Sequence, residues 1–201
     1  TIEAVVSVAR GNVQVSLSPE AYERVLRARH LIDEISASHR PVYGVNTGFG
    51  IFSDRPIPAA DSARLSRNLI LSHAVASGQP LPAEVVRAAM LIRANTLAIG
   101  HSGVRPQVIE TLLEMLNRGV TPEVPSQGSL GSSGDLAPLS HLSLVFTTDA
   151  ADLEEESGWA DSRGQRMSGK AAMQAAGIPR LILGPKEGLA LNNGATFSAA
   201  M

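Results

Sequence analysis

The chain reads Gly128-Ser-Leu-Gly-Ser-Ser-Gly-Asp-Leu-Ala-Pro-Leu-Ser-His141 in its second half, where a glycine- and serine-rich loop leads directly into a helical pattern. Helical spacing follows the loop, with apolar side chains at Leu136, Leu139, Leu142, Val145 and Phe146. The first N–H groups of such a helix lack intrahelical partners. Taken alone, the loop is either a turn capped by Ser133 or Asp135, or an anion site at a helix amino terminus. The lysine of a phosphate-binding loop is missing, which disfavours the anion site.

Helical signals extend over most of the remaining sequence. Ser18-Pro19 supplies an N-cap followed by proline, which predicts a helix reaching about Ala37. The same reasoning predicts further helices over residues 59–76, 82–97, 105–118 and 168–176. An apolar, Ala- and Gly-rich run over residues 187–201 also has helical character. The fold class expected from these signals is mainly α, with a small mixed amino-terminal part leading into the start of a long-helix bundle.

Three segments depart from helical spacing. Apolar residues alternate with polar ones over residues 13–17, which predicts a short strand. Residues 41–58 contain three glycines and three prolines and are expected to form a long loop. Residues 152–168 contain an acidic triplet and few apolar positions, which predicts a solvent-exposed segment outside the core.

The composition narrows the classes of function. The chain has 201 residues, of which 44% are hydrophobic and 18% charged, as expected for a folded protein. A net charge of -2 and only seven aromatic residues disfavour a nucleic-acid partner. The absence of cysteine excludes thiolate chemistry, no His/Asp/Glu cluster has metal-site spacing, and no apolar run suits a membrane span. A cytoplasmic protein without a metal or membrane partner is therefore expected, with His30 and His39 at its surface.

Two long motifs resemble those of one enzyme family. The string over residues 128–141 is similar to the signature of the histidine and phenylalanine ammonia-lyases, and Val42-Tyr-Gly-Val-Asn-Thr-Gly-Phe-Gly50 is similar to their other amino-terminal signature. Weaker similarity runs through residues 68–74, 100–106 and 187–194. The resemblance thus covers nearly the whole chain. It implies that residues 1–201 are the amino-terminal portion of an ammonia-lyase, carrying a catalytic tyrosine loop (41–58) and an electrophile loop (128–135), with the carboxy-terminal helical portion absent.

The resemblance implies a cofactor made from the chain itself, so that no dissociable cofactor is needed. The amide nitrogen of Gly134 would attack the carbonyl of Ser132, and loss of water, including the hydroxyl of Ser133, would leave a methylidene-imidazolone (MIO). Gly134 suits this closure because it has no Cβ and tolerates compressed turns. The family more often has alanine where this chain has Ser132. Because only the carbonyl of that residue enters the ring, the change is expected to be tolerated.

The resemblance also assigns roles to other residues. Tyr43 matches the family's general base, a role that requires surroundings favouring a phenolate, and Gly50 belongs to the glycines that let its loop approach the substrate. His73 stands where the family selects the substrate side chain, and histidine there is similar to the histidine-specific members. Asn193 matches an asparagine that binds the electrophile or the substrate, although its neighbours Asn192 and Ala195-Thr196 depart from the family pattern.

The function implied is elimination of ammonia from L-histidine to give urocanate, by a homotetramer when full length. A tyrosine or phenylalanine ammonia-lyase, or a 2,3-aminomutase, is the alternative within the family. An alternative of another class is a non-catalytic fragment that acts as a folding or assembly module. The 201 residues alone are expected to be inactive, because family members place an arginine for the substrate carboxylate in the part that would follow.

Overall fold

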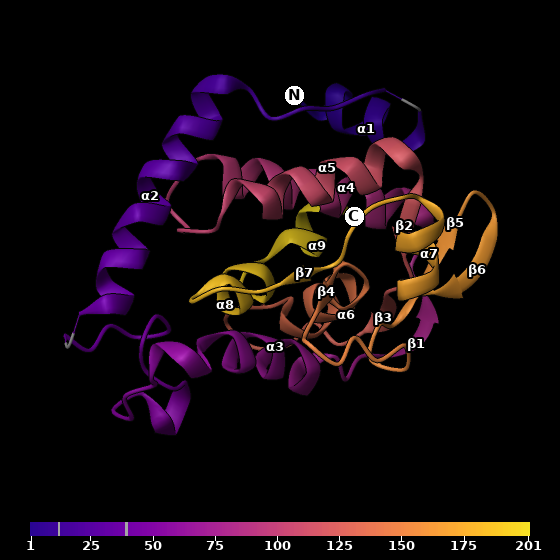
Figure 1. Cartoon of the computed structure of the whole chain (residues 1–201). Coiled ribbons are helices and arrows are strands. Elements are labelled where there is room, and N and C mark those ends of the chain that lie inside the picture. The colour runs from indigo at the N-terminus through magenta and orange to yellow at the C-terminus, as the bar shows by residue number, and fades with distance from the viewer. Residues whose placement is uncertain (12, 39) are drawn as a thin grey trace.

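The computed structural model describes residues 1–11, 13–38 and 40–201 (Figure 1). Its α-helices are α1 (Ile2–Arg10), α2 (Pro19–Ala37), α3 (Ser62–His73), α4 (Ala83–Ala98), α5 (Pro106–Arg118), α6 (Leu136–Phe146), α7 (Gly169–Ala175), α8 (Glu187–Asn192) and α9 (Thr196–Ala200). Two 3-10 helices, η1 (Gly50–Phe52) and η2 (Ala59–Asp61), precede α3. Short strands are β1 (Ser77–Pro80), β2 (Val120–Pro122), β3 (Pro125–Gln127), β4 (Thr147–Thr148), β5 (Trp159–Ser162), β6 (Gln165–Ser168) and β7 (Leu181–Ile182). The predicted mainly α fold is confirmed.

The helices pack as two groups around one core. In the first group α4 contacts α1, α5 and α9, and in the second α3, α6 and α8 contact one another. Figure 1 shows α8 and α9 between the α4–α5 pair and the α3–α6 pair. The fully buried side chains of both groups include Met90, Ile109, Leu112, Leu139 and Leu142. They belong to one core cluster, and burying them supplies the main driving force for folding and joins the two groups.

The strands form small antiparallel pairings and one parallel pairing. β1 pairs with β3, β5 lies between β2 and β6, and β4 is parallel to β7. The β5–β6 hairpin lies at the side of the molecule next to α7 (Figure 1). These short strands connect helices and do not form a core sheet.

The predicted helix boundaries agree best with the structure where a capping residue or a proline marks them. The Ser18 hydroxyl accepts a hydrogen bond from Ala21 N at 3.2 Å, as the Ser-Pro pair predicts. Pro106 starts α5, and Gly119 ends it with a φ of 75°. The helix predicted over residues 59–76 instead ends at His73. The Ala76 N–H is bonded to His141 Nε2 at 3.1 Å, and β1 begins directly afterwards, so the helix does not continue.

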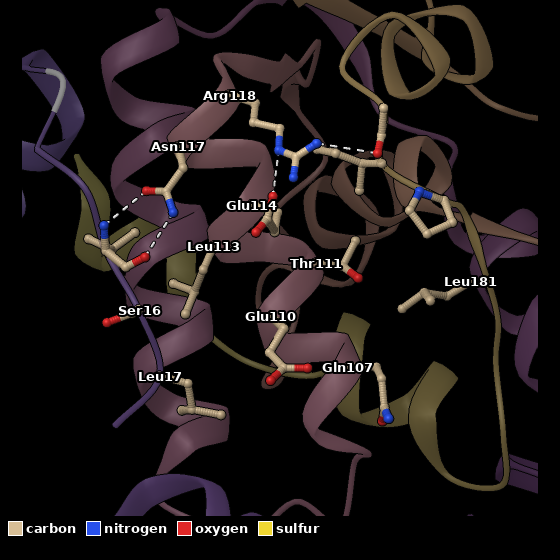
Figure 2. A pocket seen from close by; sticks show the side chains of 14 residues that line it. Ser16, Leu17, Gln107, Glu110, Thr111, Leu113, Glu114, Asn117, Arg118 and Leu181 are labelled. Carbon is tan, nitrogen blue, oxygen red and sulfur yellow. Dashed lines mark hydrogen bonds and ion pairs between the residues drawn. The ribbon is translucent and has the colours of Figure 1, made fainter. Parts of the chain in front are cut away.

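The predicted strand over residues 13–17 is wrong. Asn117 on α5 accepts a hydrogen bond from Val15 N at 2.9 Å and donates one to Val15 O at 2.8 Å. One side chain thus satisfies the backbone groups that a partner strand would bond. Figure 2 shows this contact beside a hollow of about 550 Å³ between α5 and residues 177–181.

Other sequence expectations also change. The segment over residues 152–168, predicted to be solvent-exposed, contains the β5–β6 hairpin, in which exposed Trp159 alternates with buried Ala160. Helix α1 carried no recognised signal, and the run over residues 187–201 is divided into α8 and α9. His30 is exposed, whereas His39 lies outside the described residues. Within the described ranges, no helix combines the length and the apolar character that a membrane crossing requires.

Candidate active site

The electrophile loop forms a tight turn at Gly134. The Asp135 N–H donates to the Ser133 carbonyl at 3.0 Å, and Gly134 between them has a φ of 71°. A hydrogen bond across a single residue with positive φ is a strained γ-turn geometry, which glycine adopts most readily. A second bond, from Leu130 N to Gly134 O at 3.0 Å, closes the loop on itself. Gly134, the last residue of the predicted triplet, therefore lies in a tight turn, and the triplet lies in a loop closed by a backbone hydrogen bond.

A backbone contact brings the Asn193 segment to this loop. Gly134 and Gly194 form an isolated parallel bridge, and the Asp135 N–H also donates to Gly194 O at 3.1 Å. Asn193 is the residue at which α8 ends. Two of the predicted site segments, separated by about sixty residues of sequence, thus meet through glycine backbone.

The Asp135 side chain also links the electrophile loop to the segment that follows Gly194. It is fully buried, and Oδ2 accepts hydrogen bonds from Phe197 N at 2.6 Å and Ser198 N at 3.3 Å. The carboxylate therefore caps α9, although Asp135 occupies the N-cap position of α6. The alternative that Ser133 or Asp135 merely caps the helix after the loop is incomplete, because the Asp135 side chain binds a helix elsewhere in the sequence.

The tyrosine loop is ordered by Asn46. Its side-chain oxygen accepts from Val42 N at 2.8 Å, and its amide nitrogen donates to Arg40 O at 2.9 Å and to Ile35 O at 3.2 Å. Asn46 therefore joins the loop to the end of α2. Asparagine side chains often order loops in this way, by bonding nearby backbone groups.

Tyr43 projects from this loop and remains 55% exposed. Its ring lies edge-on to Phe49, with 6.1 Å between the ring centroids, and its hydroxyl oxygen accepts a long hydrogen bond of 3.5 Å from Gly50 N. Gly50 has a φ of 56° and faces open space. Gly44 packs so closely on α8 that an added Cβ would lie 2.5 Å from Leu189 Cδ2. The loop is thus placed against the helix that ends at Asn193.

His73 is the last residue of α3. Its Nδ1 lies 2.9 Å from Leu69 O and 3.1 Å from the Ser72 hydroxyl oxygen. Because a carbonyl only accepts hydrogen bonds, this geometry assigns the proton of the neutral ring to Nδ1 and leaves Nε2 as an acceptor. His73 and Ser72 line a hollow of about 560 Å³ together with Phe49, Phe52 and Arg55 of the tyrosine loop.

The predicted site residues therefore form two groups. Gly134, in the loop with Ser132 and Ser133, pairs with Gly194 of the Asn193 segment, whereas the tyrosine loop shares a hollow with His73. Helix α8 connects the groups, because Leu189 contacts the tyrosine loop and Asn193 follows at its end. Within the described part of the chain, no hydrogen bond joins Tyr43 directly to residues 128–135.

Sequence reasoning missed the partners that hold these groups. The sequence predicts Asp135 only as a cap of the following helix, and Arg93 has no motif signal beyond its place in a helical pattern. Arg93 is 4% exposed and bonds the carbonyl oxygens of Ala190 and Asn193. Burial lowers the pKa of Arg93 to about 10, and the Asp135 carboxylate opposes this lowering. The buried Arg93 side chain thus bonds the end of α8, a contact between distant segments that the local sequence does not predict.

His141 fixes the chain just after His73. It lies on α6, and its Nε2 accepts the hydrogen bond from Ala76 N. This arrangement requires that nitrogen to be unprotonated, and burial lowers the pKa of His141. A proton on the ring therefore favours the unfolded chain. The stability linked to His141 is full above the unfolded pKa, about 6.5, and is lost as the pH falls from there towards the lowered folded value.

Acidification from about pH 7.5 to about pH 5.5 is therefore expected to destabilise the parent protein more than a His141→Gln variant, whose side-chain oxygen accepts without titrating in this range. Urea midpoints at the two pH values measure the difference. His30→Gln, at an exposed position, is the matched control and should follow the parent. An identical loss of stability in the parent and His141→Gln would contradict this linkage.

Comparison with known proteins identifies the family of the chain. The model of the family described as aromatic amino acid lyase matches residues 1–201, so the chain belongs to this family. The histidine ammonia-lyase of Caldanaerobacter subterraneus subsp. tengcongensis is 50% identical over 201 residues, which are 100% of this chain and 38% of that protein. The chain therefore spans about two fifths of that relative's length.

Solved structures share the fold. The ergothionase of Treponema denticola, described as an ergothioneine-degrading enzyme, has a TM-score of 0.90 and 34% identity, covering 100% of this chain and 38% of its own. The tyrosine aminomutase of Streptomyces globisporus has a TM-score of 0.86 and 34% identity, covering 100% of this chain and 36% of its own. The architecture is thus common to family members with different named reactions, so the substrate must be argued from the site.

Proposed function

We propose that the whole protein is an ammonia-lyase that eliminates ammonia from L-histidine to give urocanate, using an MIO group formed from Ser132, Ser133 and Gly134. The observation that carries the proposal is the compressed turn at Gly134, held by Gly194 and followed directly by Asp135 and α6. The histidine ammonia-lyase relative named above supports the choice of substrate.

The residues present fit this group. The Gly134 nitrogen would bond to the Ser132 carbonyl carbon, and one water would carry away that carbonyl oxygen with the amide hydrogens of Ser133 and Gly134. A second water would take the hydroxyl and the α-hydrogen of Ser133, leaving the exocyclic alkene. The hydrogen bond from Leu130 N to Gly134 O encloses residues 131–133 and restricts their conformations, which reduces the entropy that closure must overcome. Once formed, the ring supplies an electrophile for the substrate's amine.

The other residues act on the substrate. Tyr43 takes the proton from the substrate's β-carbon, and its ring is exposed and therefore accessible. Asn193 follows α8 beside the loop and donates or accepts hydrogen bonds at the reacting group. The unpaired N–H groups at the start of α6 stabilise negative charge that develops on the loop.

The assignment of histidine rests on His73. Its Nε2 is an acceptor that suits the N–H of an imidazole side chain, and the apolar rings of Phe49 and Phe52 line the same hollow. A phenol O–H would also satisfy that acceptor, so tyrosine is the second candidate substrate. The tyrosine aminomutase neighbour makes a 2,3-aminomutase the corresponding second reaction. The proposed partners are a small aromatic amino acid and, in a cytoplasmic homotetramer, further copies of the protein.

Substrate assays decide among these reactions. The natural full-length protein is expected to form urocanate from L-histidine faster than coumarate from L-tyrosine or cinnamate from L-phenylalanine, as followed by absorbance. A β-amino acid product would identify an aminomutase instead. The non-catalytic folding or assembly module would form none of these products. Its intact mass would equal the mass calculated from the sequence, with no loss of water.

Replacing His73 with phenylalanine is expected to lower the kcat/KM for histidine relative to that for phenylalanine by about ten-fold or more, because an apolar wall replaces the acceptor. The ratio of the two kcat/KM values is the measurement. His30→Phe makes the same exchange at an exposed position of α2 and should leave the ratio unchanged. An unchanged ratio in His73→Phe would remove this residue from substrate selection.

A further inference from the structure

Arg93 lies on α4, far in sequence from both active-site loops, yet its guanidinium covers the Asn193–Gly194 backbone. Its Nη2 donates to Asn193 O at 2.8 Å and also to Ala190 O. These carbonyls belong to the end of α8, where the last helix carbonyls lack intrahelical partners and carry negative partial charge. The arginine thus closes the end of the helix that leads to Asn193.

The contact with Gly194 is direct. An added Cβ on Gly194 would lie 2.6 Å from Arg93 Nη1, so a larger residue would push the guanidinium away. The same Gly194 forms the bridge to Gly134 and accepts the hydrogen bond from Asp135 N. Gly194 therefore lies between Arg93 and Gly134, whose nitrogen would close the ring.

Opposite charges lie on the two sides of this contact. The carboxylate of Asp135 is fully buried and bonded to the α9 backbone, and it acts through space on the buried Arg93 cation. A buried charge is stable only when opposite charge and hydrogen bonds compensate for its lost hydration. The pair therefore favours the arrangement in which the turn at residues 193–195 is held between α4 and the electrophile loop.

We propose that Arg93 is a positioning residue that holds the Asn193–Gly194 turn against Gly134 and thereby controls the rate of ring closure in the electrophile loop. This inference rests on the proposed function, since it concerns the formation of the same ring. Arg93 forms no hydrogen bond with Ser132 or Ser133 among the described residues, and it acts on the loop through the Asn193–Gly194 turn and through the charge of Asp135. Its removal should let the Asn193–Gly194 turn move and release Gly134, whose nitrogen must reach the Ser132 carbonyl carbon.

The chain offers a matched control on the same helix. Arg87 is half-buried on α4 and also donates to backbone carbonyls, at Ala9 (3.0 Å), Val8 (2.9 Å) and Leu116 (3.3 Å). These contacts hold α1 and α5 rather than the electrophile loop. Arg87→Met and Arg93→Met therefore remove the same group from one helix, with comparable partners but different neighbours.

Intact mass after synthesis of the natural full-length protein gives the fraction of chains that have lost two waters. Arg93→Met is expected to mature about ten-fold more slowly or worse, since a misplacement of about 1 Å can cost up to about 10²-fold in rate. Arg87→Met should mature like the parent. Arg93→Lys keeps the cation but loses the planar guanidinium, whose Nη2 bonds the two carbonyls while Nη1 lies beside Gly194, so its rate should lie between those of the parent and Arg93→Met.

Amide hydrogen exchange distinguishes the two variants, because each should loosen a different segment. Amides of residues 190–198 should exchange faster in Arg93→Met, whereas amides near residues 8–11 should exchange faster in Arg87→Met. Maturation of Arg93→Met at the parent's rate, or equal slowing by Arg87→Met, would overturn the proposal. If Arg93→Met does not fold, Arg93→Lys decides, and maturation at the parent's rate then overturns it. A parent protein that loses no water would instead refute the proposed function itself.

Discussion

Replacing Ser133 with alanine in the full-length protein is expected to abolish elimination while leaving the helix content unchanged. The Ser133 hydroxyl is the oxygen lost when the exocyclic alkene forms, and alanine has no group to lose. Ser133 makes none of the side-chain hydrogen bonds found among the described residues, so its loss should not disturb α6 or the turn at Gly134. Urocanate formation and far-ultraviolet circular dichroism measure the two effects.

Ser132→Ala is the matched control for this change. It removes the neighbouring hydroxyl, but only the carbonyl of residue 132 enters the ring, and this residue is exposed. The control should keep its activity and lose two waters like the parent. Near-normal turnover by Ser133→Ala would remove the electrophile from the mechanism.

Replacing Tyr43 with phenylalanine is expected to lower kcat for histidine by about 10²- to 10⁴-fold, the usual contribution of a general base. The ring contact with Phe49 needs no hydroxyl, so the loop should keep its place beside α8. Initial rates at saturating histidine measure the loss. Intact mass should show that the electrophile still forms, because the Tyr43 hydroxyl takes no part in ring closure.

Tyr22→Phe tests whether the effect belongs to this position. Tyr22 is the other tyrosine of the chain and lies on α2, outside the tyrosine and electrophile loops. This variant should keep the parent's kcat. A Tyr43→Phe enzyme with kcat close to that of the parent would show that another group removes the β-proton.

Local physics explains which parts of the fold were predictable. The Ser18 cap, Pro106 and Gly119 act within one turn of their helices, so their sequence signals located α2 and α5. The alternation over residues 13–17 failed because Asn117, about a hundred residues away, satisfies the backbone that a strand would pair. Nonlocal partners of this kind leave no periodic trace in the sequence.

The candidate site shows the same division. Motif resemblance supplied Tyr43, His73, Asn193 and the Ser132 to Gly134 triplet as candidates, because each lies in a string similar to those of the family. It did not supply Arg93, whose role depends on α4 lying against the end of α8. Neither could it show that the Asp135 carboxylate binds α9, since that bond joins segments more than sixty residues apart.

Formation of the electrophile is the central claim, and fragment mass spectrometry of the peptide containing residues 128–135 tests it most directly. The natural full-length protein is digested, and the mass loss is assigned to individual residues. The predicted result is a peptide lighter by two waters, with both losses confined to residues 132–134 and absent from the same peptide of Ser133→Ala. A peptide of unmodified mass from protein that actively eliminates ammonia would contradict the claim.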